Sequence, residues 1–150
     1  MTIRPAELND LPYIVQLLAN DALGAQRERY EQPLPNSYHE AFVRIQKDTN
    51  QELTVLENKD QKIIGTLQLS FIPYLTYRGG TRAQIEAVRI HEDHRGTGIG
   101  QLLFEWAIAR AKTKGAHVVQ LTTDKKRPKA LLFYQKLGFA ASHEGMKLHL

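Results

Sequence analysis

The run Arg95-Gly96-Thr97-Gly98-Ile99-Gly100 places glycine at every second position directly before an amphipathic helical pattern. The residues up to Ile90 predict a strand, and apolar residues at helical spacing predict a helix from about position 98 to 114. A helix N-terminus presents unpaired N–H groups and a partial positive charge, so it attracts anions. Glycine lacks the Cβ that would keep a phosphate away from those groups, and the guanidinium of Arg95 can contact a phosphate oxygen. The run therefore predicts a pyrophosphate-binding turn, with a glycine-rich surface turn that holds no ligand as the alternative.

Two better-known phosphate loops are excluded by the residues that follow this run. A dinucleotide fingerprint needs glycine at position 101 or 103, where the chain has Gln101 and Leu103. A P-loop needs glycine and then lysine at positions 101 and 102, and neither is present.

Strand and helix patterns alternate along the chain, without an internal repeat or a linker. Strands are expected at 2–6, 51–57, 62–72, 83–90 and 117–123, followed by two short final strands at 139–142 and 146–150. Helices are expected at 10–19, 37–48, 98–114 and 127–137. Residues 21–36 are polar and interrupted by glycine and proline, which predicts a loop. The pattern predicts one α/β domain over residues 1–150 with a mixed sheet.

Composition limits the classes of partner and the compartment. The chain has 150 residues, of which 42% are hydrophobic, so it can bury a sizeable core. It has no cysteine, which excludes disulfides and a thiol-based site. No secretory signal and no apolar run of membrane-spanning length are present. A cytoplasmic protein without a membrane partner is therefore expected. The net charge of +4 favours an anionic ligand.

Two motifs in order resemble those of the GNAT family of N-acetyltransferases. The glycine run resembles the family's motif A, which is Arg or Gln, two residues, Gly, one residue, and then Gly or Ala. The later segment "ALLFYQKLGF", residues 130–139, resembles the family's helix that ends F-Y-x-K-x-G-F. Strand and helix signals precede both motifs as in the family, so the resemblance covers nearly the whole chain. It implies a strongly twisted sheet of about six to seven strands flanked by about four helices.

The resemblance also implies acetyl-CoA as co-substrate and a set of residues that bind it. The pyrophosphate would lie on the backbone N–H groups of the motif A turn, at Arg95, Gly96, Thr97, Gly98, Ile99 and Gly100. The pantetheine arm would pair like an extra strand with the main chain of Val88 and Ile90. Many relatives carry Asn three residues before the alanine of the later helix, but this chain has Arg127 there. Arg127 could instead contact a phosphate group of the ligand, or belong to a solvated basic turn.

Two side chains match the family's acid–base positions. Glu86 lies on the strand before motif A, where relatives often have a general base, and a carboxylate can take the proton of an attacking amine. An exposed glutamate, or one paired with Arg82 or Arg89, is the alternative. Tyr134 matches the tyrosine that in many relatives donates a proton to the CoA thiolate, and a phenol suits this because its pKa lies above that of a thiol. Tyr134 as part of the apolar core is the alternative.

The acceptor is expected to be a primary amine of a small polar metabolite. In the family, the acceptor pocket would correspond to residues 23–38, 74–82 and 142–147, which supply arginine and tyrosine side chains. A protein or peptide acceptor, and a non-catalytic CoA-binding or nucleic-acid-binding module, are the other hypotheses. No metal site is expected, because His91 and His94 lie three residues apart in a loop rather than in a metal-binding helix. No nucleic acid partner is expected, and a homodimer is possible because relatives commonly form one.

Overall fold

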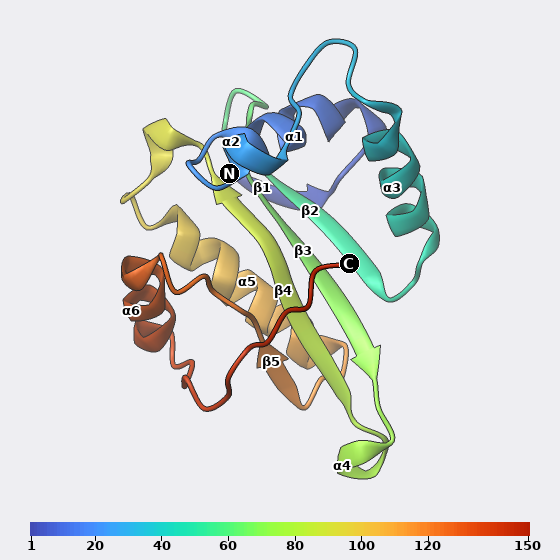
Figure 1. Cartoon of the computed structure of the whole chain (residues 1–150), viewed down its shortest axis with the longest axis vertical. Helices are drawn as coiled ribbons and strands as arrows, with labels where there is room; N and C mark the ends of the chain where they lie inside the picture. The colour runs from blue at the N-terminus through green and yellow to red at the C-terminus, as the bar shows by residue number, and fades with distance from the viewer. The chain divides into compact units, whose positions relative to one another are not determined.

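The computed structural model describes residues 1–150, which form two compact units, residues 1–120 and residues 121–150. Figure 1 labels the elements along the chain. The strands are β1 (Thr2–Pro5), β2 (Gln51–Glu57), β3 (Ile63–Pro73), β4 (Thr81–Ile90) and β5 (Val118–Gln120). The helices are α1 (Leu11–Ala19), α2 (Gly24–Arg27), α3 (Asn36–Lys47), α4 (Thr76–Gly79), α5 (Ile99–Thr113) and α6 (Pro128–Lys136). Short 3-10 turns occupy Leu8–Asp10 and Glu92–His94.

The first unit is built on a sheet with the strand order β1-β2-β3-β4-β5. The pairings from β1 to β4 are antiparallel, and β4 pairs with β5 in parallel. Two parallel strands that follow each other in the chain need a crossover connection, and α5 provides the one between β4 and β5. The predicted α/β class with a mixed sheet is confirmed.

Helices cover both faces of this sheet. On one face, which we call the α1 face, Val55 belongs to a buried cluster with residues of α1 and with Phe42 of α3. On the other face, Leu69 and Ile85 are opposite each other and buried. The helix α5 lies over this second face, as shown by two contacts of its C-terminal part. Arg110 pairs with Glu52 at 2.7 Å, and the Lys114 ammonium lies 5.6 Å from the centre of the Phe71 ring.

A β-bulge interrupts β4. Gln68 is opposite Glu86 and Thr66 is opposite Arg89, so one residue of β3 faces two residues of β4. Ala87 has a φ of 53°, a conformation that L-residues rarely adopt. The extra residue brings Glu86 and Arg89 onto the same α1 face, although they are three residues apart.

The resemblance predicts too many strands and too few helices. The structure has five strands rather than six to seven, and six helices rather than about four. Residues 139–142 and 146–150 form no strand, because β propensity makes a strand only where a partner strand pairs with it. The additional helices are the single turns α2, inside the predicted loop 21–36, and α4, between β3 and β4. None of the helices is both long and apolar enough to cross a lipid bilayer.

An ion-pair cluster holds the start of the chain on the sheet and makes stability depend on pH. Arg4 donates to both carboxylate oxygens of Asp10, at 2.7 and 2.9 Å, and its Nε donates to Glu57 at 2.8 Å. Burial acts to raise the pKa of Asp10, but hydrogen bonds from Arg4 and from the backbone N–H of Glu7 outweigh it and lower that pKa. The stabilisation is therefore present above the usual pKa of aspartate and is lost as the pH falls through the lowered value.

We expect Asp10→Asn to lower the free energy of unfolding by about 2 kcal/mol at pH 7, because a charge-assisted bidentate contact is lost. The difference between the two proteins should shrink toward zero at acid pH, once the pH has fallen through the lowered pKa of Asp10. Urea unfolding at both pH values measures it. An equal difference at both would mean that packing, rather than charge, carries the effect.

Candidate functional site

The motif A turn begins after the short 3-10 turn and ends where α5 begins. Gly96 has a φ of 76°, and Gly98, the N-cap residue of α5, has a φ of 86°. Both values lie in the left-handed region that favours glycine. A Cβ built on either residue would meet no atom within 4 Å, so the space above the turn is open. The glycines are thus required by the backbone conformation, and they leave room for a ligand.

The start of α5 directs N–H groups into this open space. The first intrahelical hydrogen bond runs from Leu102 N–H to Gly98 O, so the N–H groups of Ile99 and Gly100 precede the helical ladder. The Thr97 hydroxyl donates to His94 O at 2.7 Å, which holds the turn together. Residues 95–98 are exposed. The turn therefore has the geometry of an anion site at a helix N-terminus.

The side chain of Arg95 is engaged with the main chain on two sides. Its Nε donates to Ile90 O at 3.1 Å, and its Nη2 donates to Asn20 O at 3.0 Å. These bonds join the motif A turn to the end of β4 and to the end of α1. The predicted contact of Arg95 with phosphate stays a prediction.

β4 loses its parallel neighbour β5 well before it reaches the turn. The parallel ladder between β4 and β5 covers only Arg82 to Gln84 on β4. Beyond Gln84, β4 continues to Ile90 and is paired with β3 on one side. On its other side, no strand from residues 1–120 pairs with this part of β4. Val88 and Ile90 lie in this part of β4, half-buried. An extended ligand could hydrogen-bond there as an added strand, which is the role that the sequence predicts for these two residues.

Glu86 lies on the α1 face of this part of β4. Its side chain is exposed, and its Oε1 accepts a hydrogen bond from Gln84 Nε2 at 2.6 Å. Gln84 in turn accepts one from Gln120 Nε2 at 2.8 Å. The arginines that could have paired with Glu86 have other partners. Arg89 pairs with Asp21, and the guanidinium of Arg82 lies 4.3 Å from the centre of the Tyr74 ring.

An ion pair that the sequence did not predict joins the bulged strand to the segment after α1. Arg89 Nε lies 3.1 Å from Asp21 Oδ2, and the two side chains are only 10% and 17% exposed. The other oxygen of Asp21 accepts the backbone N–H of Gly24 at the start of α2. The pair therefore fixes the beginning of the predicted loop 21–36 against the end of β4.

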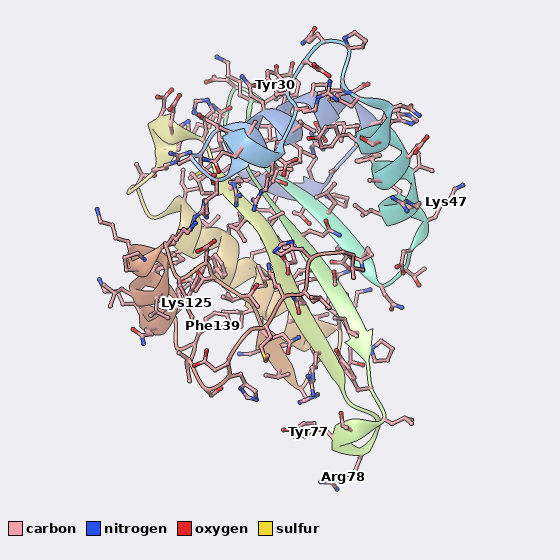
Figure 2. All side chains as sticks on the ribbon, in the orientation of Figure 1. Tyr30, Lys47, Tyr77, Arg78, Lys125 and Phe139 are labelled. Atoms are coloured by element: carbon pink, nitrogen blue, oxygen red, sulfur yellow. The ribbon has the colours of Figure 1, made fainter.

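The segments expected to line the acceptor pocket lie at opposite ends of β4. Residues 23–38 are anchored near its end through Asp21, whereas residues 74–82 precede its start, and Figure 2 labels Tyr30 in the first segment and Tyr77 and Arg78 in the second. The ten residues of β4 span roughly 30 Å. The two segments therefore cannot line one pocket for a small amine.

The segment 23–38 is ordered by its own contacts and borders a hollow. The Tyr38 hydroxyl donates to Glu28 and accepts the N–H of Arg29. Burial raises the pKa of Tyr38, and the bond to Glu28 acts in the same direction. A hollow of about 290 Å³ lies between the end of α1 and the 3-10 turn before motif A. Its lining includes Asn20, Tyr30, His91 and Glu92.

The remaining predicted residues belong to the second unit, residues 121–150. Arg127 is the N-cap residue of α6, at the end of a turn in which its N–H donates to Asp124 O at 2.9 Å. Tyr134 lies on α6 between two aromatic rings, with ring centres 5.6 Å from Phe133 and 6.2 Å from Phe139. Its ring is half-buried in this cluster. The structure thus brings Glu86, Val88, Ile90 and the motif A turn together in one unit, and holds Arg127 and Tyr134 on one helix of the other.

Comparisons with known proteins agree with this geometry. The family model described as Acetyltransferase (GNAT) family matches residues 20–139. The chain is similar to the glucosamine 6-phosphate N-acetyltransferase of Trypanosoma brucei brucei, with 34% identity over 89 residues, which are 59% of this chain and 58% of that protein. It is also similar to the L-methionine sulfoximine/L-methionine sulfone acetyltransferase of Pseudomonas aeruginosa, with 25% identity over 94% of this chain and 81% of that protein. A solved structure from Bacillus halodurans C-125, named a transcriptional regulator, is 58% identical, with a TM-score of 0.96 and 99% of both chains covered.

Proposed function

The chain belongs to the GNAT family of acetyltransferases, and from this premise we propose that it moves the acetyl group of acetyl-CoA to a primary amine of a small polar metabolite. The observation that carries this proposal is the motif A turn, whose open N–H groups lie beside the bulged strand with Glu86. A CoA thioester and an attacking amine need an anion site and a carboxylate beside a strand edge, and this edge of β4 has no neighbouring strand among residues 1–120 beyond Gln84.

The donor would be held through its charges and its amide groups. The N–H groups from Gly96 to Gly100 would hold the pyrophosphate, since residues 96–98 are exposed and the turn lies at the positive end of α5. The main chain of Val88 and Ile90 would pair with the pantetheine arm, which supplies the thioester to the region of Glu86. Arg127, at the start of α6, would add a positive charge toward a phosphate group.

The chemistry would be a direct attack in a ternary complex. A free amine is mostly protonated at neutral pH, since its pKa is about 10 by analogy with lysine. Glu86 would accept the proton of the amine, directly or through water, and the nitrogen would then form a bond to the thioester carbon. As the tetrahedral intermediate collapses, the carbon–sulfur bond breaks and the Tyr134 hydroxyl would give its proton to the leaving thiolate. The second proton, which the nitrogen still carries after the attack, would then restore the phenol of Tyr134, directly or through water. The products are the N-acetyl amine and CoA.

A small polar acceptor is supported by the named relatives and by the loop near motif A. One relative is named for glucosamine 6-phosphate and another for methionine sulfoximine and methionine sulfone, and all three are small polar amines. Residues 23–38 supply Arg27 and Arg29, which pair with Glu28 and Glu31, and Tyr30, which borders the hollow next to His91 and Glu92. These side chains suit an amine that carries an anionic or hydroxyl group.

A thiol-release assay with acetyl-CoA tests this proposal. The acceptors are amino acids and their sulfoximines, amino sugars and their phosphates, polyamines, aminoglycosides and peptides. We expect turnover with one class of small polar amine at least about 100-fold above the rate without acceptor, a range reached by general acid–base catalysis alone. Turnover with peptides only would favour a protein acetyltransferase and contradict the small-molecule acceptor.

A regulatory, non-catalytic role is the second candidate, and it rests on the name of the Bacillus halodurans structure, a transcriptional regulator. Binding of acetyl-CoA without turnover of any amine would favour that role as a CoA-binding module. A cytoplasmic location and a homodimer remain predictions, which fractionation of cells and light scattering would test.

A further inference from the structure

The carboxylate of Glu86 ends a hydrogen-bonded row of side-chain amides that crosses from β5 to β4. Gln120 donates to Gln84, and Gln84 donates to Glu86. Gln84 and Glu86 are two residues apart on β4 and therefore lie on the same face. Gln120 is the register partner of Gln84 in the parallel ladder. The row is therefore built by the regular geometry of two paired strands.

The direction of the row follows from the chemistry of its end. An ionised carboxylate only accepts hydrogen bonds, so the amide of Gln84 must present its NH2 group to Glu86. The oxygen of Gln84 then faces Gln120, whose NH2 group satisfies it. Each amide thus donates toward the carboxylate, and hydrogen bonds in such a chain strengthen one another.

We propose that Gln84 is a positioning residue that holds the Glu86 carboxylate for proton transfer, and that Gln120 fixes the orientation of the Gln84 amide. This inference rests on the proposed function, since it assigns Glu86 the role of base. An exposed glutamate side chain otherwise samples several rotamers. A bond of 2.6 Å to one carboxylate oxygen restricts that sampling and leaves the other oxygen for the amine or for a bridging water.

The neighbouring strand provides a matched control. Gln68 of β3 is directly opposite Glu86 in the sheet register, but its amide donates to Gln51 Oε1 at 2.8 Å. The Ser70 hydroxyl donates to the same oxygen at 2.7 Å. Gln68 therefore shares residue type, sheet face and proximity with Gln84, and lacks the bond to the carboxylate.

The row itself is tested by the side-chain amide resonances of the free protein, assigned from single glutamine variants. Glu86→Leu removes the acceptor and should move the NH2 resonances of Gln84 and, through it, those of Gln120, while those of Gln68 stay in place. Unmoved Gln84 resonances would overturn the inference, whether or not the protein acetylates any amine.

The catalytic consequence is tested by turnover with an amine found in the acceptor screen. We expect Gln84→Leu to lower kcat about tenfold, the order expected for losing a hydrogen bond to a charged group. The KM for acetyl-CoA should change less than about twofold, because that ligand's proposed contacts are elsewhere. Gln120→Leu should lower kcat by a smaller factor, and Gln68→Leu should not lower it. Thermal melts of all variants check that each is folded.

A double-mutant cycle separates positioning from a general structural effect. In the Glu86→Gln background, Gln84→Leu should have no further effect on kcat, because Gln84 acts only through the carboxylate. Additive losses, or equal losses from Gln84→Leu and Gln68→Leu, would overturn the inference while leaving the proposed acetyl transfer intact. If no amine is acetylated by the unaltered protein, the proposed function fails and the catalytic role of Gln84 fails with it, whereas the amide resonances still decide whether the row exists.

Discussion

Gly98→Val is expected to weaken the binding of acetyl-CoA by at least about tenfold. Valine is β-branched, and holding it in the left-handed backbone conformation of position 98 adds roughly 1–3 kcal/mol of strain to the turn that binds the ligand. The φ of Gly98 is 86°, and valine avoids this region. The turn would relax to another conformation, and the N–H groups of residues 96–100 would no longer point together at one anion. A side chain would also enter the open space above the turn, where no protein atom lies within 4 Å of a Cβ. Calorimetric titration with acetyl-CoA measures the change.

Gly115 provides the matched control at the other end of the same helix. Its φ is 74°, and a Cβ built there also meets no atom within 4 Å. Gly115→Val should therefore cost a similar amount of folding stability, and it should leave the affinity for acetyl-CoA unchanged. Unchanged affinity in Gly98→Val would show that the turn does not hold the pyrophosphate.

Tyr134→Phe is expected to lower kcat about 100-fold, at the lower end of what general acid catalysis contributes. The substitution keeps the ring, and therefore the edge contacts with Phe133 and Phe139, and removes only the hydroxyl. The affinity for acetyl-CoA should stay within about twofold of the original, because the lost proton matters in the transition state and not in the bound ground state. Steady-state kinetics with the best acceptor amine, together with a binding titration, measure both quantities.

Two controls accompany this substitution. Tyr13→Phe removes a hydroxyl from a residue on α1 that is 56% exposed, and it should leave kcat unchanged. Phe139→Leu loosens the aromatic cluster around Tyr134 while leaving the hydroxyl in place. A loss of kcat in Phe139→Leu with none in Tyr134→Phe would make Tyr134 a packing residue.

The sequence predicts the parts of the site that depend on local chemistry. Glycines at every second position before a helix predict an anion-binding turn, and the structure has left-handed glycines at 96 and 98. The β-bulge also has a trace in the sequence. Apolar side chains occupy the odd positions 85 and 87 and then the even positions 88 and 90. One extra residue in a strand shifts the alternation of apolar side chains in this way.

Contacts between distant segments could not be predicted in this way. The pair of Arg89 with Asp21 joins residues 68 positions apart, and no local pattern marks either of them as a partner of the other. The bond from Gln120 to Gln84 depends on the register of two parallel strands, which the α5 crossover sets. Single-turn helices such as α2 and α4 escape periodicity, since four residues do not make a repeat. The strands expected at 139–142 and 146–150 do not form, because the β propensity of a segment does not provide the neighbouring strand with which it would have to pair.

A crystal structure with coenzyme A bound tests the central claim most directly. The expected result is a pyrophosphate within hydrogen-bond distance of the backbone N–H groups of residues 96–100, with the pantetheine arm along β4 at Val88 and Ile90. A ligand bound elsewhere with this turn empty, or a turn filled by neighbouring side chains, would contradict the claim.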